Sequence, residues 1–116
     1  MNVSKLFKSF YYAFQGIRTA LLQQNMKVHV TCAIAVIISG FATGLSPVEW
    51  SILLIVIGAV ISLEMMNTAI EAVVDLASPA IHPLAKKAKD VSAGSVFVFA
   101  VVSVIIGGLI FIPKWF

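Results

Sequence analysis

The first 24 residues alternate between apolar and polar side chains with the period of an α-helix. The apolar positions are Leu6, Phe7, Phe10, Phe14, Ile17 and Leu21, and the polar ones between them are Lys5, Lys8, Tyr12, Gln15, Thr19 and Gln23. A basic helix with aromatic side chains on its apolar face is typical of segments that lie in the plane of a membrane surface. We therefore expect an amphipathic surface helix over residues 3–24; the alternative is an ordinary helix that packs on other protein.

Three long apolar stretches follow, over residues 28–45, 47–76 and 91–112. A helix needs about 20 residues to cross the hydrocarbon core of a bilayer, so each stretch is predicted to be a transmembrane helix. Between the second and the third lies a polar connection, residues 78–90, in which Pro83 offers another helix start.

The second stretch has sharp ends. Ser46 occupies an N-cap position, Pro47 the first helical position, and Glu49 the third residue after the cap, which together make a capping box. At the other end, Ser78-Pro79 predicts that the helix stops, because the residue before a proline is excluded from helical geometry.

Composition agrees with this pattern. Of the 116 residues 60% are apolar and 11% charged, and the mean hydropathy is +1.04. A soluble domain of this size cannot bury so much apolar surface, so lipid must cover the rest. We predict an all-α integral membrane protein made of one domain, residues 1–116. Nucleic acid is a poor partner for so few basic residues on an apolar chain.

The basic residues orient the chain across the membrane. Four of the eight precede Val28, three lie at positions 86, 87 and 89, and the last is Lys114, whereas the 42–50 connection has none. Cytoplasmic loops carry an excess of Lys and Arg. The N-terminus is therefore predicted to be cytoplasmic, with seven of the eight basic residues on that side.

The second apolar stretch also carries polar side chains. Its segment EMMNTAIEAVVD places Glu64, Asn67, Glu71 and Asp75 at offsets of 0, 3, 7 and 11 residues, which is one narrow face of a helix. Ionisable groups at membrane depth are costly and usually mark function. Oxygen ligands of this kind suit Mg²⁺, and one acid could serve as a general base. Hydrogen bonding between helices is the alternative.

A basic cluster, Lys86-Lys87-Ala88-Lys89-Asp90, precedes the third span on the same predicted side as the end of the acidic face. Lysines beside metal-binding carboxylates are what a nucleoside triphosphate requires. Taken alone, these lysines would be topology markers. The chain has no P-loop, kinase glycine-rich loop or Rossmann fingerprint. Two interpretations remain at this point: a membrane enzyme that uses a nucleoside triphosphate, and a cation-coupled membrane transporter that uses the intramembrane carboxylates.

The stretch from Glu64 to Asp75, followed by the stretch from Ala85 to Asp90, resembles the prokaryotic diacylglycerol kinase family, which includes undecaprenol kinases. The resemblance covers essentially the whole chain, including Gly16 and the Asn25-to-His29 entry to the first span. It implies a homotrimer in the bacterial cytoplasmic membrane, with active sites shared between subunits at the cytosolic boundary. It also implies phosphorylation of a lipid primary hydroxyl, with ATP and Mg²⁺ as cofactors.

The resemblance further implies residue roles. Glu64 would be the general base and Asn67 would support it, while Glu71 would bind the metal. The nucleotide-binding set would be Glu71, His82, Lys89, Asp90 and Tyr12. Undecaprenol is favoured over diacylglycerol as the substrate, because Asn25…His29 and His82-Pro83-Leu84-Ala85 look more like the undecaprenol kinases.

One departure from the family pattern concerns the metal. The family usually has a second metal-binding glutamate at the end of the surface helix, where this chain reads Leu22-Gln23-Gln24-Asn25. We assign Gln24 to the metal site, although an amide oxygen binds Mg²⁺ more weakly than a carboxylate does. A catalytically inactive kinase-like scaffold is the hypothesis that this substitution raises.

Overall fold

The computed structural model describes all 116 residues as four α-helices and no strand. Helix α1 is Val3–Leu21, α2 is Gln24–Thr43, α3 is Pro47–Ala77 and α4 is Pro83–Trp115. The last three are each long and apolar enough to cross a membrane. The prediction of an all-α protein with three candidate spans is therefore confirmed.

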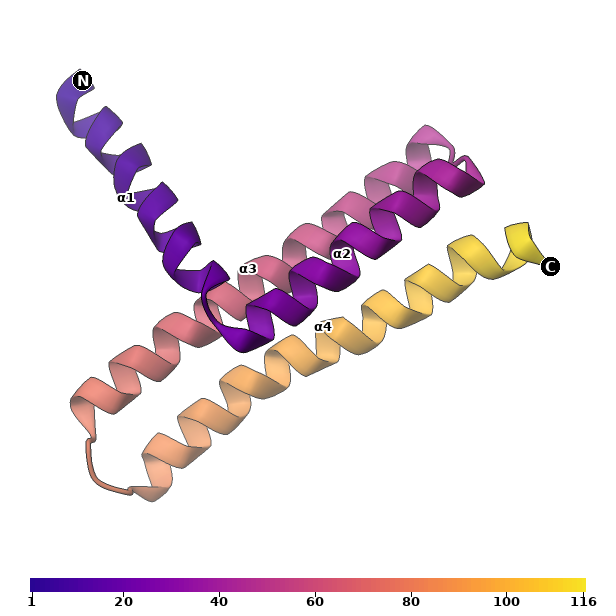
Figure 1. The fold of residues 1–116 in the computed structure, drawn as a ribbon. Coiled ribbons are helices and arrows are strands. Elements are labelled where there is room, and N and C mark those ends of the chain that lie inside the picture. The colour runs from indigo at the N-terminus through magenta and orange to yellow at the C-terminus, as the bar shows by residue number, and fades with distance from the viewer.

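Helices α2, α3 and α4 lie alongside one another, and α1 projects from them at the start of α2 (Figure 1). Most of the contacts between helices join α3 to α4. The connection between α2 and α3 is short because Gly44, whose φ is 82°, ends α2 and the capping box of Ser46 and Glu49 begins α3. Both reciprocal hydrogen bonds of that box are present, at 3.2 and 2.9 Å.

Helices α2, α3 and α4 meet at the end that holds the C-terminus. Leu53, Ile110 and Phe111 form a small buried cluster there. Lys114 pairs with Glu49 at 3.1 Å, and the Trp115 indole donates to the Thr43 hydroxyl at 2.8 Å. These polar contacts hold the last turn of α4 to the starts and ends of its neighbours.

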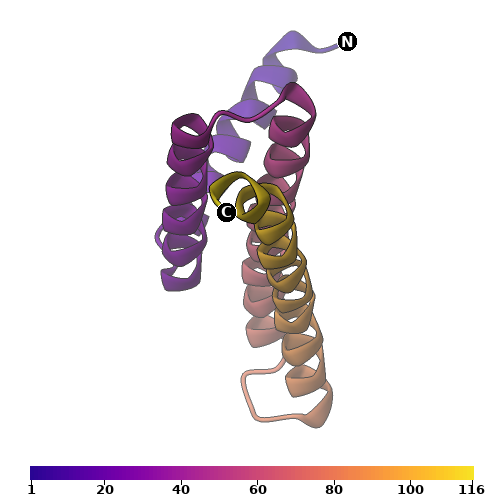
Figure 2. The ribbon, with the colours of Figure 1, turned by 90° about the vertical axis from the view of Figure 1, so that its right-hand side faces the viewer.

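At the opposite end of the helix bundle, α3 and α4 extend further than α2 (Figures 1 and 2). With 31 residues, α3 exceeds the 20 residues of α2, and the excess corresponds to about 16 Å of helix. The α3–α4 hairpin accordingly extends past the start of α2, as both views show (Figures 1 and 2). The C-terminal part of the acidic face therefore lies on a projecting hairpin, beyond the level at which α2 begins.

Two boundaries differ from the sequence-based expectation in a way that matters for the site. The surface helix was expected to reach residue 24, but α1 ends at Leu21 and Gln24 already begins α2. Helix α4 begins at Pro83, the helix start that the sequence offered, and continues without a break into the apolar stretch, so the expected connection over residues 78–90 shortens to residues 78–82 and the segment from Lys86 to Asp90 is helical. Pro83 at the first position and the His82 side chain, which accepts from the Leu84 N–H, set that start.

Only 12 of the 116 residues are buried in the single chain. Large apolar side chains are exposed on all four helices. A chain with so little interior cannot be held together by its own core in water, and lipid or further protein must cover these faces.

Candidate active site

The acidic face of α3 runs from a buried end to an exposed end. Glu64 and Asn67 are 4% and 3% exposed, whereas Glu71 and Asp75 are exposed. The four residues share one face because their spacing follows the helical period. Glu64 and Asn67 are covered by neighbouring helices, and Asp75 lies two residues before the end of α3 on the projecting hairpin. The face thus connects a buried carboxylate to an exposed, charged helix end.

At its buried end, Glu64 contacts a histidine from another helix. His29, in the second turn of α2, places its Nε2 3.4 Å from Glu64 Oε2. The two side chains are 21% and 5% exposed. The sequence did not identify His29 as a site residue, because the spacing of residues on α3 carries no information about which α2 residue lies opposite.

In the middle of the face, Asn67 and Glu71 are joined. The Asn67 Nδ2 donates to Glu71 Oε1 at 3.1 Å. Asn67 Oδ1 is buried and has no hydrogen-bond partner in the chain. A buried carbonyl oxygen without a donor is costly and is uncommon in folded proteins, so this oxygen is expected to receive a donor or cation from a ligand.

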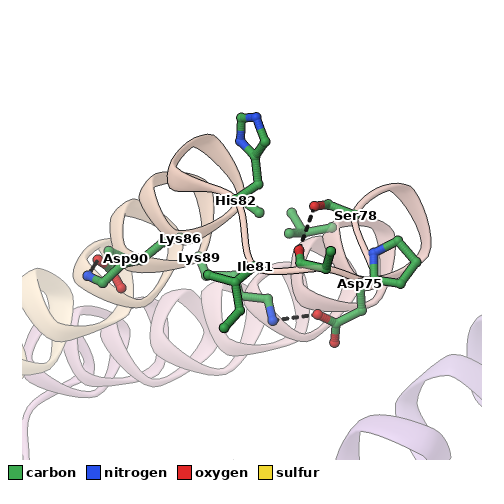
Figure 3. A pocket seen from close by; sticks show the side chains of 11 residues that line it. Asp75, Ser78, Ile81, His82, Lys86, Lys89 and Asp90 are labelled. Carbon is green, nitrogen blue, oxygen red and sulfur yellow. Dashed lines mark hydrogen bonds and ion pairs between the residues drawn. The ribbon is translucent and has the colours of Figure 1, made fainter.

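The exposed end forms a cleft between the end of α3 and the start of α4. Its volume is about 310 Å³, and it is lined by Val74, Asp75, Ser78, Pro79, Ala80, Ile81, His82, Ala85, Lys86, Lys89 and Asp90. Figure 3 shows Lys89 and Asp75 directed toward one another across the cleft, where they form an ion pair. Lys86 pairs with Asp90 one turn along α4, at 2.5 Å. The cleft therefore offers ammonium groups next to carboxylates.

His82 lies in the wall of this cleft, but its imidazole points away from the Lys89–Asp75 pair (Figure 3). Its Nδ1 accepts the Leu84 N–H at 3.1 Å and so caps α4. In the chain by itself, His82 therefore has a structural role as the N-cap.

Two predicted site residues lie apart from this face. Tyr12 is exposed on α1, and Gln24 is the exposed first residue of α2; neither side chain forms a hydrogen bond or ion pair with α3. No group of three or more His, Cys, Asp or Glu side chains converges within one chain. One chain thus brings Glu64, Asn67 and Glu71 onto one face and His82, Lys89 and Asp90 into the cleft at its exposed end, whereas Tyr12 and Gln24 lie apart.

The donor set nevertheless fits a divalent cation that prefers oxygen. Glu71 supplies a carboxylate, and the unpartnered Asn67 Oδ1 lies beside it. Mg²⁺ is usually held by one or two carboxylates together with substrate phosphates and water, so a single protein carboxylate could suffice where a phosphate supplied further ligands.

Comparison with known proteins shows the family to which the chain belongs. The family described as prokaryotic diacylglycerol kinase matches residues 11–111. The chain belongs to this family. Prokaryotic diacylglycerol kinases are lipid kinases, so the activity requires a nucleotide phosphate donor and a lipid acceptor.

Some relatives of the chain are named undecaprenol kinase and others diacylglycerol kinase. The chain is 52% identical to an undecaprenol kinase of Bacillus subtilis, over 97% of this chain and 93% of that protein. It is 38% identical to a diacylglycerol kinase of Synechocystis, over 93% of this chain and 63% of that protein. A diacylglycerol kinase of Haemophilus influenzae is 30% identical, over 95% of each chain.

Proposed function

We propose that this membrane protein transfers a phosphoryl group from ATP to the primary hydroxyl of a membrane lipid, with Mg²⁺ as the metal. The observation that carries the proposal is that the acidic face of α3 runs from a buried end at Glu64 to an exposed end at Asp75. Its buried carboxylate, Glu64, lies among helices that face lipid, and its exposed end opens into the charged cleft at Lys89. A lipid hydroxyl and a nucleotide phosphate would thus approach the same face from opposite ends.

The chemistry assigns a step to each residue. Glu64 takes the proton from the lipid hydroxyl, whose oxygen forms a bond to the γ-phosphorus as the bond from that phosphorus to the leaving oxygen of ADP breaks. Bound Mg²⁺ would neutralise charge on the phosphates. Glu71 would hold it, Asn67 would orient the neighbouring groups, and Lys89 would bind phosphate oxygens.

Undecaprenol is the favoured acceptor. Supporting this choice, the identity to the Bacillus subtilis undecaprenol kinase, 52%, exceeds the 38% and 30% to the two diacylglycerol kinases. The alignment with this relative also covers nearly the full length of both proteins. Selectivity between the lipids depends on the apolar surface around Glu64, so the substrate has to be tested directly.

We also propose that the working unit is a homotrimer with cytoplasmic active sites shared between subunits. Tyr12 and Gln24 would then complete a site on a neighbouring chain's α3, while His82 and Asp90 would line the nucleotide cleft beside Lys89 of their own chain. The large exposed apolar surface and the absence of a three-ligand cluster in one chain support this proposal. The cytoplasmic location of the N-terminus rests on the distribution of basic residues.

A catalytically inactive kinase-like scaffold is the second candidate, and one observation favours it. Gln23 and Gln24 occupy the place in which the family usually has a metal-binding glutamate. A transporter is less well supported, since it gives the charged cleft at Lys89 and Asp75 no role.

The deciding experiment is phosphate transfer by the purified protein in mixed micelles. Undecaprenol and diacylglycerol are offered separately, with ATP and Mg²⁺, and the phosphorylated lipid is quantified. Product from undecaprenol at the higher kcat/KM supports the proposal in full, and a preference for diacylglycerol corrects the substrate only. Absence of product from both lipids, with folded protein, would favour the inactive scaffold.

A further inference from the structure

Glu64 has one side-chain partner in the chain, and that partner is His29. The carboxylate forms no other ion pair, and it accepts no hydrogen bond from the rest of the chain. The contact joins two helices, because His29 belongs to α2 and Glu64 to α3. By contrast, Glu71 on the same face is held by Asn67 of its own helix.

A buried carboxylate with a single contact depends on that contact in two ways. Removing an ionised carboxylate from water is costly unless a donor or cation compensates, and Glu64 is only 5% exposed at its side chain. A glutamate side chain also has three rotatable bonds, so a fixed donor is needed to hold the carboxylate in one orientation. His29 is at the edge of the same buried region, at 21% exposure.

We propose that His29 is a positioning residue for Glu64: its Nε2–H donates to Glu64 Oε2 and holds the carboxylate where it can take the lipid proton. This inference rests on the proposed kinase activity. The 3.4 Å separation is long for a hydrogen bond, and such contacts commonly shorten when substrate binds. The early start of α2 at Gln24 places His29 in the second turn, level with Glu64.

Two variants separate the donor from the bulk of the side chain. His29→Gln keeps an N–H donor at a similar reach, and His29→Leu keeps volume but removes the donor. Cys32→Ala, one turn further along α2, is the matched control, since Cys32 lines the same apolar groove between α2, α3 and α4 as His29 does. kcat and KM for lipid and for ATP are measured for each protein.

A positioning role predicts that His29→Leu lowers kcat by about 10²-fold, because a small misplacement of a catalytic group has that effect. Both KM values should stay within about twofold, since the contact acts on the transition state rather than on ground-state binding. His29→Gln should recover most of the lost kcat, and Cys32→Ala should match the wild type.

A double-mutant cycle tests whether His29 acts on kcat through Glu64. In a Glu64→Asp protein the shortened carboxylate no longer reaches His29, so adding His29→Leu should lower kcat by less than about threefold further. A full additional loss would show that His29 acts elsewhere and would overturn the proposal. If the His29→Leu variant folds poorly, His29→Ala, which also removes the donor, takes its place in both arms of the cycle.

The remaining outcomes are equally decisive. An unchanged kcat in His29→Leu, a change confined to KM, or a loss in His29→Gln as large as in His29→Leu would each refute the positioning role while leaving the kinase activity established. A wild-type protein without lipid kinase activity would refute both proposals.

Discussion

Lys89 of α4 forms an ion pair with Asp75 of α3 across the cleft at the tip of the projecting hairpin. The two side chains are 40% and 64% exposed, so the pair contributes little to stability. The pair matters for position: Asp75, the last acid of the acidic face, holds the Lys89 ammonium group at the place where we propose that it binds the nucleotide.

Replacing Lys89 should weaken the use of ATP. We expect Lys89→Ala to raise the KM for ATP by about tenfold or more, because one charge-assisted contact to phosphate contributes on the order of 1.5–3 kcal/mol. Lys87→Ala is the control, since Lys87 is close by on α4 but forms no ion pair. An ATP dependence that is the same in both variants would remove Lys89 from the nucleotide site.

Glu64→Gln should abolish turnover and leave the fold intact. The amide has the shape of the carboxylate but cannot take the proton, and loss of a general base lowers the rate by about 10²–10⁴-fold. Steady-state transfer to lipid gives the rate, and circular dichroism and size-exclusion chromatography report folding and assembly. Glu49→Gln removes a carboxylate and the Lys114 ion pair at the opposite end of α3, so it controls for loss of charge and of stability away from the site. Substantial activity in Glu64→Gln would exclude Glu64 as the base.

Metal dependence should respond to a carboxylate at Gln24. We expect Gln24→Glu to lower the Mg²⁺ concentration that gives half-maximal activity, because a carboxylate binds Mg²⁺ more strongly than an amide oxygen. Gln15→Glu adds the same charge to α1 at a position not assigned to the metal. An equal response in both variants would show a general charge effect. Activity that appears only in Gln24→Glu would favour the inactive scaffold for the natural chain.

The membrane orientation is testable with single cysteines in a Cys32→Ala background. Lys87→Cys, on the hairpin, should react with a membrane-impermeant maleimide only after the cells are permeabilised. Val48→Cys, in the first turn of α3, should react in intact cells. The reverse pattern would show that the N-terminus and the cleft face outward.

Packing at the other end predicts a stability effect. A Cβ at Gly40 would lie 2.7 Å from the Trp50 ring, whereas a Cβ at Gly58 meets nothing within 4 Å in the chain. Gly40→Ala should therefore lower the free energy of unfolding in detergent by about 1–3 kcal/mol. Gly58→Ala is the comparison. Equal thermal midpoints for the two variants would show that Trp50 moves aside without cost.

Local rules determined much of the fold in advance. The capping box at Ser46, the stop before Pro79 and the length of the apolar stretches depend on neighbours in sequence, and each has its expected counterpart in α3 or in a candidate span. Helix α4 shows the limit of this reasoning: residues 78–90 were predicted to be a connection in which Pro83 offers a helix start, and α4 does begin at Pro83 but runs without a break into the third apolar stretch. A charged helical turn and a loop have similar composition, so composition alone does not distinguish them.

The sequence by itself determined that Glu64, Asn67, Glu71 and Asp75 share a face, because a single helix fixes the angle between its own side chains. Only the tertiary structure decided what lies opposite them: His29 at Glu64 and Lys89 at Asp75. Those contacts depend on where α2 begins and on how the α3–α4 hairpin closes. Such distances between helices are set by packing, and no repeat in the sequence encodes them.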